Sequence, residues 1–230
     1  MKRFWKQAAV ADDAAGCAIH LDGRPVRTPA RAPLVVPTRA LADAIAAEWQ
    51  AQDSDIDPRS MPLTGLANAA IDHAATDPTT FAATLTPFAE TDLLCYRDDR
   101  QAELATEQAA AWNPLLAWAE ARYGVEFTLA QGVIHVAQPP ATIAALQAAI
   151  AALPAFRLVA LSPLVTISGS LVAALAVESG ARDAAELWPI VCLDQLYQER
   201  RWGHDAAAAA QRAAHERDWL NAARFLGLLQ

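Results

Sequence analysis

The chain has 230 residues, of which 54 % are hydrophobic, and 18 lysine and arginine residues against 26 aspartate and glutamate residues give a net charge of −8. This length allows one large domain or two small ones with a buried core. The acidic balance and the absence of a lysine- or arginine-rich run argue against nucleic acid as a partner, because a phosphate backbone requires clustered cations. One nearly apolar stretch, residues 158–177, is interrupted by Ser162, Pro163 and Gly169, so a buried helix is favoured over a membrane span.

The N-terminal part of the chain has the pattern of short strands. Residues 17–21 lead into Asp22-Gly23, and an Asp-Gly pair between extended segments predicts a hairpin because both turn positions favour positive φ. Pro25 in the returning segment predicts a short strand or an edge strand, since proline has no backbone N–H to donate. Residues 34–36, Leu-Val-Val, form another candidate strand that ends before Pro37.

A helix is predicted after these strands. Thr38 is a typical N-cap residue, and apolar residues follow it at helical spacing. Pro58 and Pro62 then interrupt the pattern, which indicates a domain boundary near this point. The sequence therefore predicts an α+β protein, with a small β-rich N-terminal domain over residues 1–60 and a mostly α-helical C-terminal domain over residues 61–230.

The remainder of the chain is expected to be mainly helical, with one exception. Caps, prolines and glycines divide it into predicted helices over residues 63–73, 77–96, 103–123, 142–153, 162–180, 183–203 and 205–229. Pro87 is expected to kink or break the second of these, Ser162-Pro163 to begin the fifth, and Asp183 to begin the sixth. Residues 125–136 alternate weakly and suggest a hairpin around Gln131-Gly132, in which case the segment 125–137 is a candidate to join the N-terminal domain.

Catalytic and metal-binding signatures are absent from the sequence. It has no glycine-rich nucleotide-binding motif, no GxSxG and no HExxH, and its five histidines lie at spacings that give no pair of ligands on one helix. Cys17, Cys95 and Cys192 lie far apart without a CxxC motif, and each has apolar neighbours, which favours reduced thiols in a reducing compartment. The sequence therefore predicts a protein that is not an enzyme and that needs no cofactor and no metal.

One segment, residues 187–205, combines apolar, acidic and aromatic side chains. In a continuous helix, one face of this segment would carry Leu187, Ile190, Val191, Asp194, Tyr197, Gln198 and Arg201. An acid within such a stripe is costly unless it is paired. Asp194 is therefore either held in an internal polar network, by Gln198, Arg201 or a neighbouring helix, or it lies on an open face that meets a partner, where aromatic and arginine side chains are common anchors. Trp202-Gly203 is either a helix stop covered by the tryptophan or a part of that face.

The sequence resembles a known family over nearly its whole length. The motifs that carry the resemblance are individually weak but specific in their order and spacing: RFWK at 3–6, LDGRPVRTP at 21–29, EW at 48–49, MPLTGLAN at 61–68, AID at 70–72, TDLLCYR at 91–97, GS at 169–170, LD at 193–194, YQ at 197–198 and WG at 202–203. They are typical of the assembly chaperones that bind the α subunit of the catalytic head of the F-type ATP synthase, in mitochondria and in some bacteria.

The resemblance implies a small β-rich domain followed by a helical one, and a protein that binds newly made α subunit and prevents its aggregation before it pairs with the β subunit. It implies no nucleotide and no metal. The important acid of the family lies in the segment that matches residues 193–198, where Asp194 is the best match, whereas Gln195 and Leu196 stand where other members often carry further acids. The predicted partner-binding residues are therefore Asp194, Tyr197, Gln198, Arg201 and Trp202.

Two other functions are kept as alternatives. A small-molecule enzyme with an unrecognised pocket, for instance a hydrolase that uses His73 or His135, would turn over a substrate. A scaffold subunit would stay in a larger final complex. No signal or transit segment is recognised after the basic N-terminus, so a bacterial cytoplasm is expected, or the mitochondrial matrix if the source is eukaryotic. The free protein is expected to be a monomer.

Overall fold

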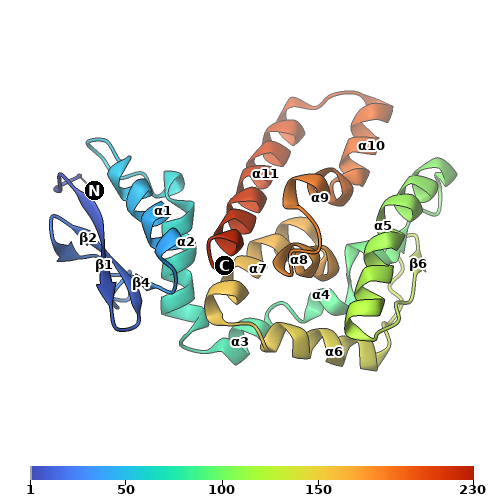
Figure 1. Ribbon diagram of the computed structural model, residues 1–230. Helices are drawn as coiled ribbons and strands as arrows, with labels where there is room; N and C mark the ends of the chain where they lie inside the picture. The colour runs from blue at the N-terminus through green and yellow to red at the C-terminus, as the bar shows by residue number, and fades with distance from the viewer. Residues whose placement is uncertain (1) are drawn as a thin grey trace. The chain divides into compact units, whose positions relative to one another are not determined.

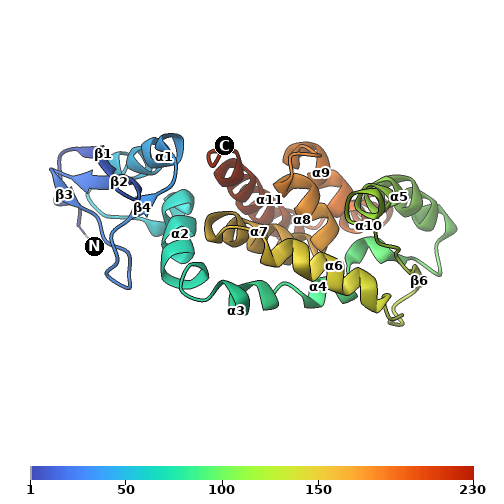
Figure 2. The same cartoon turned by 60° about the horizontal axis from the view of Figure 1, so that its bottom comes forward.

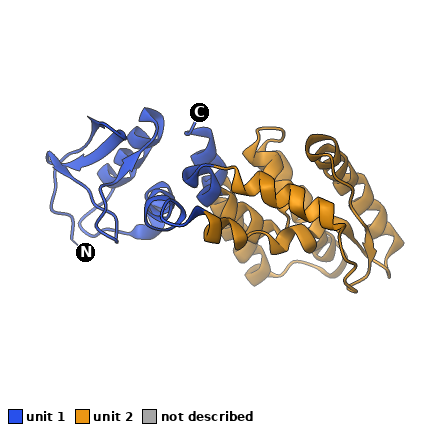
Figure 3. Ribbon diagram, turned by 90° about the horizontal axis from the view of Figure 1, so that it is seen from below, with its two compact units in different colours: residues 1–78, 154–160, 221–230 blue, residues 79–153, 161–220 orange. Residues whose placement is uncertain are grey.

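The computed structural model describes residues 2–230, and the chain forms two compact units. Unit 1 comprises the residues up to 78 together with 154–160 and 221–230, and unit 2 comprises 79–153 and 161–220 (Figure 3). The chain leaves unit 1 after Pro78 and returns to it twice, so both units join segments that are distant in the sequence. The division of the sequence into domains 1–60 and 61–230 stays a prediction.

Unit 1 contains a four-stranded antiparallel sheet in which the second strand pairs with each of the others (Figure 1). Its strands are β1 (Ala8–Asp13), β2 (Gly16–Leu21), β3 (Arg24–Pro25) and β4 (Val35–Val36). The predicted hairpin is confirmed, because Asp22 and Gly23 join β2 to β3 with φ angles of 47° and 78°. Glycine is required at position 16, where φ is 144° and a Cβ would lie 2.3 Å from the carbonyl oxygen of Val36.

Two helices complete the N-terminal part of unit 1. They are α1 (Arg39–Gln50) and α2 (Pro62–Ala69), which continues into a π-helical turn, Ala70–Ala74; a short 3₁₀ turn, Pro58–Ser60, lies between them. The predicted cap is confirmed, since Thr38 Oγ1 accepts a hydrogen bond from the N–H of Leu41. The carboxylate of Glu48 accepts hydrogen bonds from the backbone N–H groups of Leu63 and Thr64, each at 2.8 Å. This acid therefore joins α1 to the start of α2.

The remaining chain is mainly helical, and the α+β class is confirmed. Its elements are α3 (Pro78–Ala83), α4 (Pro87–Glu90), a 3₁₀ turn η3 (Leu93–Cys95), β5 (Tyr96–Arg97), α5 (Ala102–Tyr123), β6 (Ala130–Gln131), α6 (Pro140–Ala151), α7 (Ala155–Ser168), α8 (Leu171–Glu178), α9 (Ala184–Val191), α10 (Leu193–Trp202) and α11 (Ala206–Gly227). In unit 2, α8 is buried along its whole length and contacts α4, α5 and α9 (Figures 1 and 2). No helix among residues 2–230 is both long and apolar enough to cross a membrane.

Two of the helices predicted before residue 181 have different bounds in the structure. The segment expected as a helix over 77–96, with a kink or break at Pro87, forms two helices, α3 and α4, and α4 begins at Pro87, so the break is confirmed. Helix ends at Glu90 and not near 96, because the carboxylate of Asp92 accepts the N–H of Leu94 and favours a 3₁₀ turn over continued helix. Ser162-Pro163 lies inside α7 and begins no helix. The break lies at Gly169, whose φ is 69°, and Ser170 caps α8 by accepting the N–H of Ala173.

The hairpin expected around Gln131-Gly132 is not formed among the described residues. Only Ala130–Gln131 is a strand in residues 125–136, and it pairs in parallel with β5 in unit 2. The N–H of Gly132 extends this pairing by donating to the carbonyl oxygen of Arg97 at 2.8 Å. Val133, Ile134 and Val136 therefore belong to an exposed loop after β6, which sequence periodicity alone does not distinguish from a strand.

Candidate partner-binding site

The helix α10 begins at a break inside the helix predicted over 183–203. α9 ends at Val191, and Cys192 separates it from α10 with φ −93° and ψ 10°. The buried indole N–H of Trp112, in α5, donates to the carbonyl oxygen of Ile190 at 2.9 Å. A continuous helix would use that oxygen for the N–H of Asp194. The prediction of one helix with a single apolar stripe is therefore wrong.

Asp194 lies half-buried in the first turn of α10. Its Oδ1 accepts a hydrogen bond from Nε2 of Gln108, in α5, at 2.8 Å. Burial raises the pKa of Asp194 above its ordinary value; the Gln108 hydrogen bond opposes this, the nearby charge of Asp98 adds to it, and Arg97 opposes it. A neighbouring helix thus holds this acid, which is one of the arrangements considered for an internal network.

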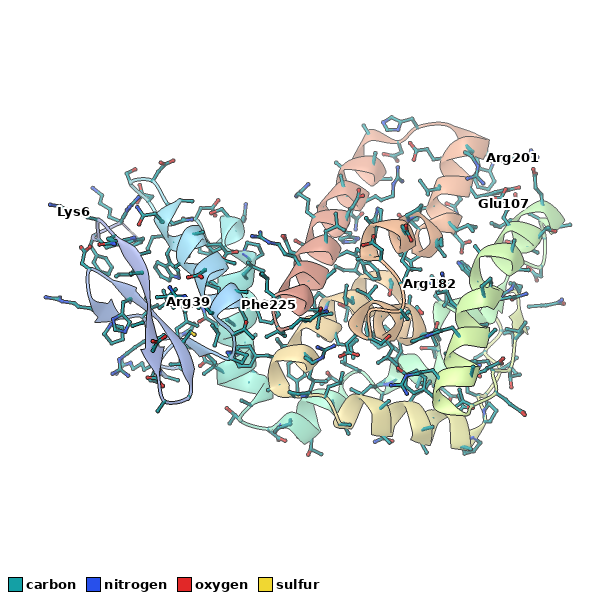
Figure 4. All side chains as sticks on the ribbon, in the orientation of Figure 1. Lys6, Arg39, Glu107, Arg182, Arg201 and Phe225 are labelled. Atoms are coloured by element: carbon teal, nitrogen blue, oxygen red, sulfur yellow. The ribbon has the colours of Figure 1, made fainter. Side chains whose placement is uncertain are left out.

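One side of α10 is attached to α5. Tyr197 is buried, and its hydroxyl donates to Oε2 of Glu103 at 3.4 Å. One turn further on, the guanidinium of Arg200 forms an ion pair with Glu107, which Figure 4 labels on α5. Together with Asp194 and Gln108, these contacts fix the orientation of α10 relative to α5.

The other side of α10 borders a hollow that it shares with α11. Gln198 and Trp202 line this hollow, and the indole of Trp202 is 67 % exposed, so it does not form a buried cover over the helix stop at Gly203. The lining includes charged groups: Glu199 is hydrogen-bonded to Nδ1 of His204 and forms an ion pair with Arg212, and these two hydrogen bonds lower the pKa of Glu199. Arg201 is exposed near the end of α10 and is labelled in Figure 4.

Asp194 borders a different hollow, a groove between α5, β5 and the loop after β6. The groove is lined by Tyr96, Arg97, Asp98, Asp99, Arg100, Gln108, Gly132, Val133 and Asp194. The guanidinium of Arg97 is buried and donates to the carbonyl oxygens of Leu94 and Tyr96 and to Asn113 Oδ1. The charged residues of the groove are therefore three acids, Asp98, Asp99 and Asp194, and two arginines, of which Arg97 directs its donors inwards and Arg100 is exposed.

The five predicted site residues therefore lie on more than one surface. Asp194 borders the groove, Tyr197 is buried against α5, and Gln198 and Trp202 share the hollow with α11, while Arg201 is exposed. The break at Cys192 and the packing on α5 decide this distribution.

Sequence reasoning missed Gln108, the residue that holds Asp194. A signal was present, because Leu104, Gln108, Trp112 and Leu115 recur at helical spacing and place a polar residue on an apolar face. Such a residue needs a buried hydrogen-bond partner. The sequence does not identify that partner, since Asp194 lies 86 residues further along the chain.

The two histidines considered for chemistry belong to different units. His73 is exposed in the π-helical turn of unit 1, whereas Nε2 of His135, in unit 2, lies 3.1 Å from Oε1 of Glu90. Burial raises the pKa of both Cys95 and Cys192 to about 12, which makes these thiols unreactive. Among residues 2–230, no group of three or more histidine, cysteine, aspartate and glutamate side chains is arranged to hold a metal ion.

Comparison with known proteins gives consistent similarities. Residues 2–120 match the sequence model of the ATP12 chaperone protein family. The chain is 27 % identical over 214 residues to mitochondrial atp12 of Schizosaccharomyces pombe, which covers 88 % of this chain and 74 % of that protein. It is similar to the crystal structure of Atp12 from Paracoccus denitrificans, with 41 % identity, a TM-score of 0.95 and coverage of 100 % and 98 % of the two chains. It is also similar to the Atu1473 protein of Agrobacterium tumefaciens, with 38 % identity, a TM-score of 0.94 and coverage of 100 % and 86 %.

Proposed function

This chain belongs to the ATP12 chaperone family, and from that premise we propose that it binds the unassembled α subunit of the F-type ATP synthase and prevents its aggregation until the β subunit arrives. The protein is a chaperone of ATP synthase assembly, so its work is reversible binding. The proposal includes a monomeric free state and a bacterial cytoplasmic location, or the mitochondrial matrix for a eukaryotic source. It involves no enzymatic step.

The physical need for such a chaperone follows from the interface that an isolated subunit exposes. Permanent subunit interfaces commonly bury about 2,000 Å² or more and resemble a core cut in half. A subunit that exposes such a surface tends to associate with itself. A chaperone must cover that surface and still leave when the permanent partner arrives, so its own interface has to be the weaker one, with a few anchors among polar contacts.

We place the partner contact at α10, with Asp194, Tyr197, Gln198, Arg201 and Trp202 as its contributors. The observation that supports this most strongly is the exposed indole of Trp202, because tryptophan and arginine are the residue types most enriched among binding anchors. Gln198 lines the same hollow, and Asp194 borders the neighbouring groove. Tyr197 contributes by positioning α10 against α5, since its side chain is buried.

The test is the substitution Asp194→Lys in the full chain, with capture of purified α subunit and suppression of its aggregation as the readouts. If Asp194 contacts the partner, we expect the fold to survive and capture to weaken by at least about tenfold, equal to about 1.4 kcal/mol. If it is a structural acid, the change removes the acceptor of Gln108 and also places an unpaired lysine charge at a half-buried position. It should then cost about 3–5 kcal/mol of the free energy of unfolding.

The matched control is Asp12→Lys, which makes the same change of charge on an exposed residue of β1 in unit 1. It should leave both the fold and capture unchanged. An Asp194→Lys protein that is folded and captures α subunit normally would remove Asp194 from the site. A pull-down from cell extract provides the wider test: a chaperone retains free α subunit, whereas a scaffold subunit copurifies with assembled ATP synthase.

A further inference from the structure

The segment that contains β6 and the loop after it exposes several large apolar side chains. Of the seven large hydrophobic residues that are exposed among residues 2–230, four lie in residues 129–136. They are Leu129, Val133, Ile134 and Val136, of which Val133 is 97 % and Ile134 76 % exposed. Single exposed apolar residues are ordinary on a protein surface, whereas a group of this kind marks an interaction site. We name residues 129–136 the apolar loop.

Hydrogen bonds fix the apolar loop to unit 2 at both ends. At its base, the side-chain amide of Gln138 donates to the carbonyl oxygen of Thr128 and accepts from its N–H, at 2.8 and 3.0 Å. Within the loop, β6 pairs with β5, and Nε2 of His135 lies 3.1 Å from Oε1 of Glu90. In Figures 1 and 2 this segment runs along the outside of unit 2, next to α5. A segment fixed in this way loses little conformational freedom when a partner covers it.

The apolar loop is continuous with the acidic groove. Val133 lines the groove together with Asp98, Asp99 and Asp194. The groove has one more acid than it has cations, since Arg97 and Arg100 face Asp98, Asp99 and Asp194. The donors of Arg97 are used by inner acceptors, and the exposed Arg100 lies 3.9 Å from Asp99. A partner that covers the loop therefore also meets an acidic surface. Charge complementarity favours a basic side chain at that point.

We propose that the apolar loop docks an apolar segment of the unassembled α subunit, and that a lysine or arginine of the same segment enters the adjoining groove towards Asp98 and Asp99. The inference rests on the proposed function and adds a surface that lies outside α10. It also explains how the chaperone limits its affinity, because one small apolar cluster with a charged border buries far less than a permanent subunit interface.

The test is the double substitution Val133→Ser and Ile134→Ser in the full chain. Both side chains are exposed, so the midpoint of thermal unfolding should not change. Capture of α subunit should weaken at least about tenfold, because full burial of a valine or isoleucine contributes about 1.5–3 kcal/mol. The matched control is Phe4→Ser, which removes an apolar side chain of unit 1 that is 69 % exposed, and it should leave capture within about twofold.

A second measurement, crosslinking, does not depend on the double serine variant. A photoreactive phenylalanine at position 133 should crosslink to α subunit, and the same group at position 4 should not. Binding should also weaken with added salt, and Asp99→Asn should reduce that dependence. If the unsubstituted chain captures no α subunit, the proposed function fails, and this inference with it. If the unsubstituted chain captures α subunit but the double variant does so equally well, or if the crosslink joins two copies of the chaperone, only the apolar loop proposal is overturned.

Discussion

Asp92 and Asp194 are two aspartates of unit 2 whose surroundings differ sharply although burial raises the pKa of both. Asp92 is completely buried, and its two oxygens accept the backbone N–H groups of Leu94 and Val172 at 3.0 and 2.9 Å. Asp194 is half-buried and accepts a side-chain N–H from Gln108 beside an open groove.

The difference separates an acid that completes the fold from one that retains capacity for a partner. Asp92 caps the turn η3 and also the first turn of α8, so it joins two segments 80 residues apart. Asp194 holds α10 against α5 through Gln108, yet an ionised carboxylate offers about four acceptor positions. The remaining positions of Asp194 face a groove that a cation can enter. The two aspartates therefore differ less in the direction of their pKa shifts than in the number of carboxylate acceptor positions that a partner can reach.

The largest expected effect is that of Asp92→Ala. The substitution leaves the N–H groups of Leu94 and Val172 buried without an acceptor, and each such group costs about 1–3 kcal/mol. We expect the free energy of unfolding in urea at pH 7 to fall by about 3–5 kcal/mol. The matched variant Asp194→Ala should cost less, about 1–3 kcal/mol, because it leaves one buried group, the side-chain amide of Gln108, without its acceptor instead of two. Equal losses for the two variants would break the comparison.

The pH dependence of stability gives the next effect. Burial raises the pKa of Asp92 from 3.8 to about 6, so the unfolded chain releases this proton first as the pH rises. The contribution of Asp92 to the free energy of unfolding is therefore largest below pH 3.8, decreases by about 3 kcal/mol as the pH rises through 6, and is constant above that.

The comparison with Asp92→Asn isolates this contribution, because the amide does not titrate. The measurement is urea unfolding of both proteins between pH 3.5 and pH 7, with the difference in free energy plotted against pH. We expect the advantage of the native chain to decrease over this interval. If the free energies of unfolding of the two proteins instead change in parallel with pH, Asp92 does not titrate between pH 3.5 and pH 7. The burial of Asp92 would then not make the stability depend on pH.

Local signals in the sequence were sufficient for much of the fold. The turn Asp22-Gly23, the cap at Thr38, the stop at Gly124 and the cap at Asp183 all depend on residues within one or two turns, and all are confirmed. The role of Asp92 depends on the N–H of Val172, which no local pattern indicates. The resemblance to a chaperone family, which rests on motifs spread along the chain, is also confirmed.

The candidate site was less accessible to sequence reasoning. The break at Cys192 depends on the indole N–H of Trp112, which donates to the carbonyl oxygen of Ile190, 78 residues further along the chain. Without that contact, the periodicity of 187–201 predicts one helix and one stripe. The apolar loop was missed for a different reason, since Val133 and Ile134 have high strand propensity and only the structure shows that they are exposed.

The substitution Arg200→Gln has the smallest expected effect. It tests the solvent-exposed ion pair that attaches α10 to α5. The ion pair of Arg200 with Glu107 is 55 % and 38 % exposed, and such pairs contribute about 0–1 kcal/mol. We expect a loss of about 0.5 kcal/mol in the free energy of unfolding, with capture of α subunit unchanged.

A double-mutant cycle with Glu107→Gln measures the pair directly, and the control is the cycle repeated in high salt, which should abolish the coupling. A coupling energy of about 2 kcal/mol or more would mean that this ion pair contributes as much to stability as contacts in a buried hydrogen-bond network. In that case the whole α10 region would resemble the surroundings of Asp92. A weak coupling instead leaves Tyr197 and Gln108 as the contacts that orient α10, so that its charged and aromatic residues are free to change partners at little cost to the fold.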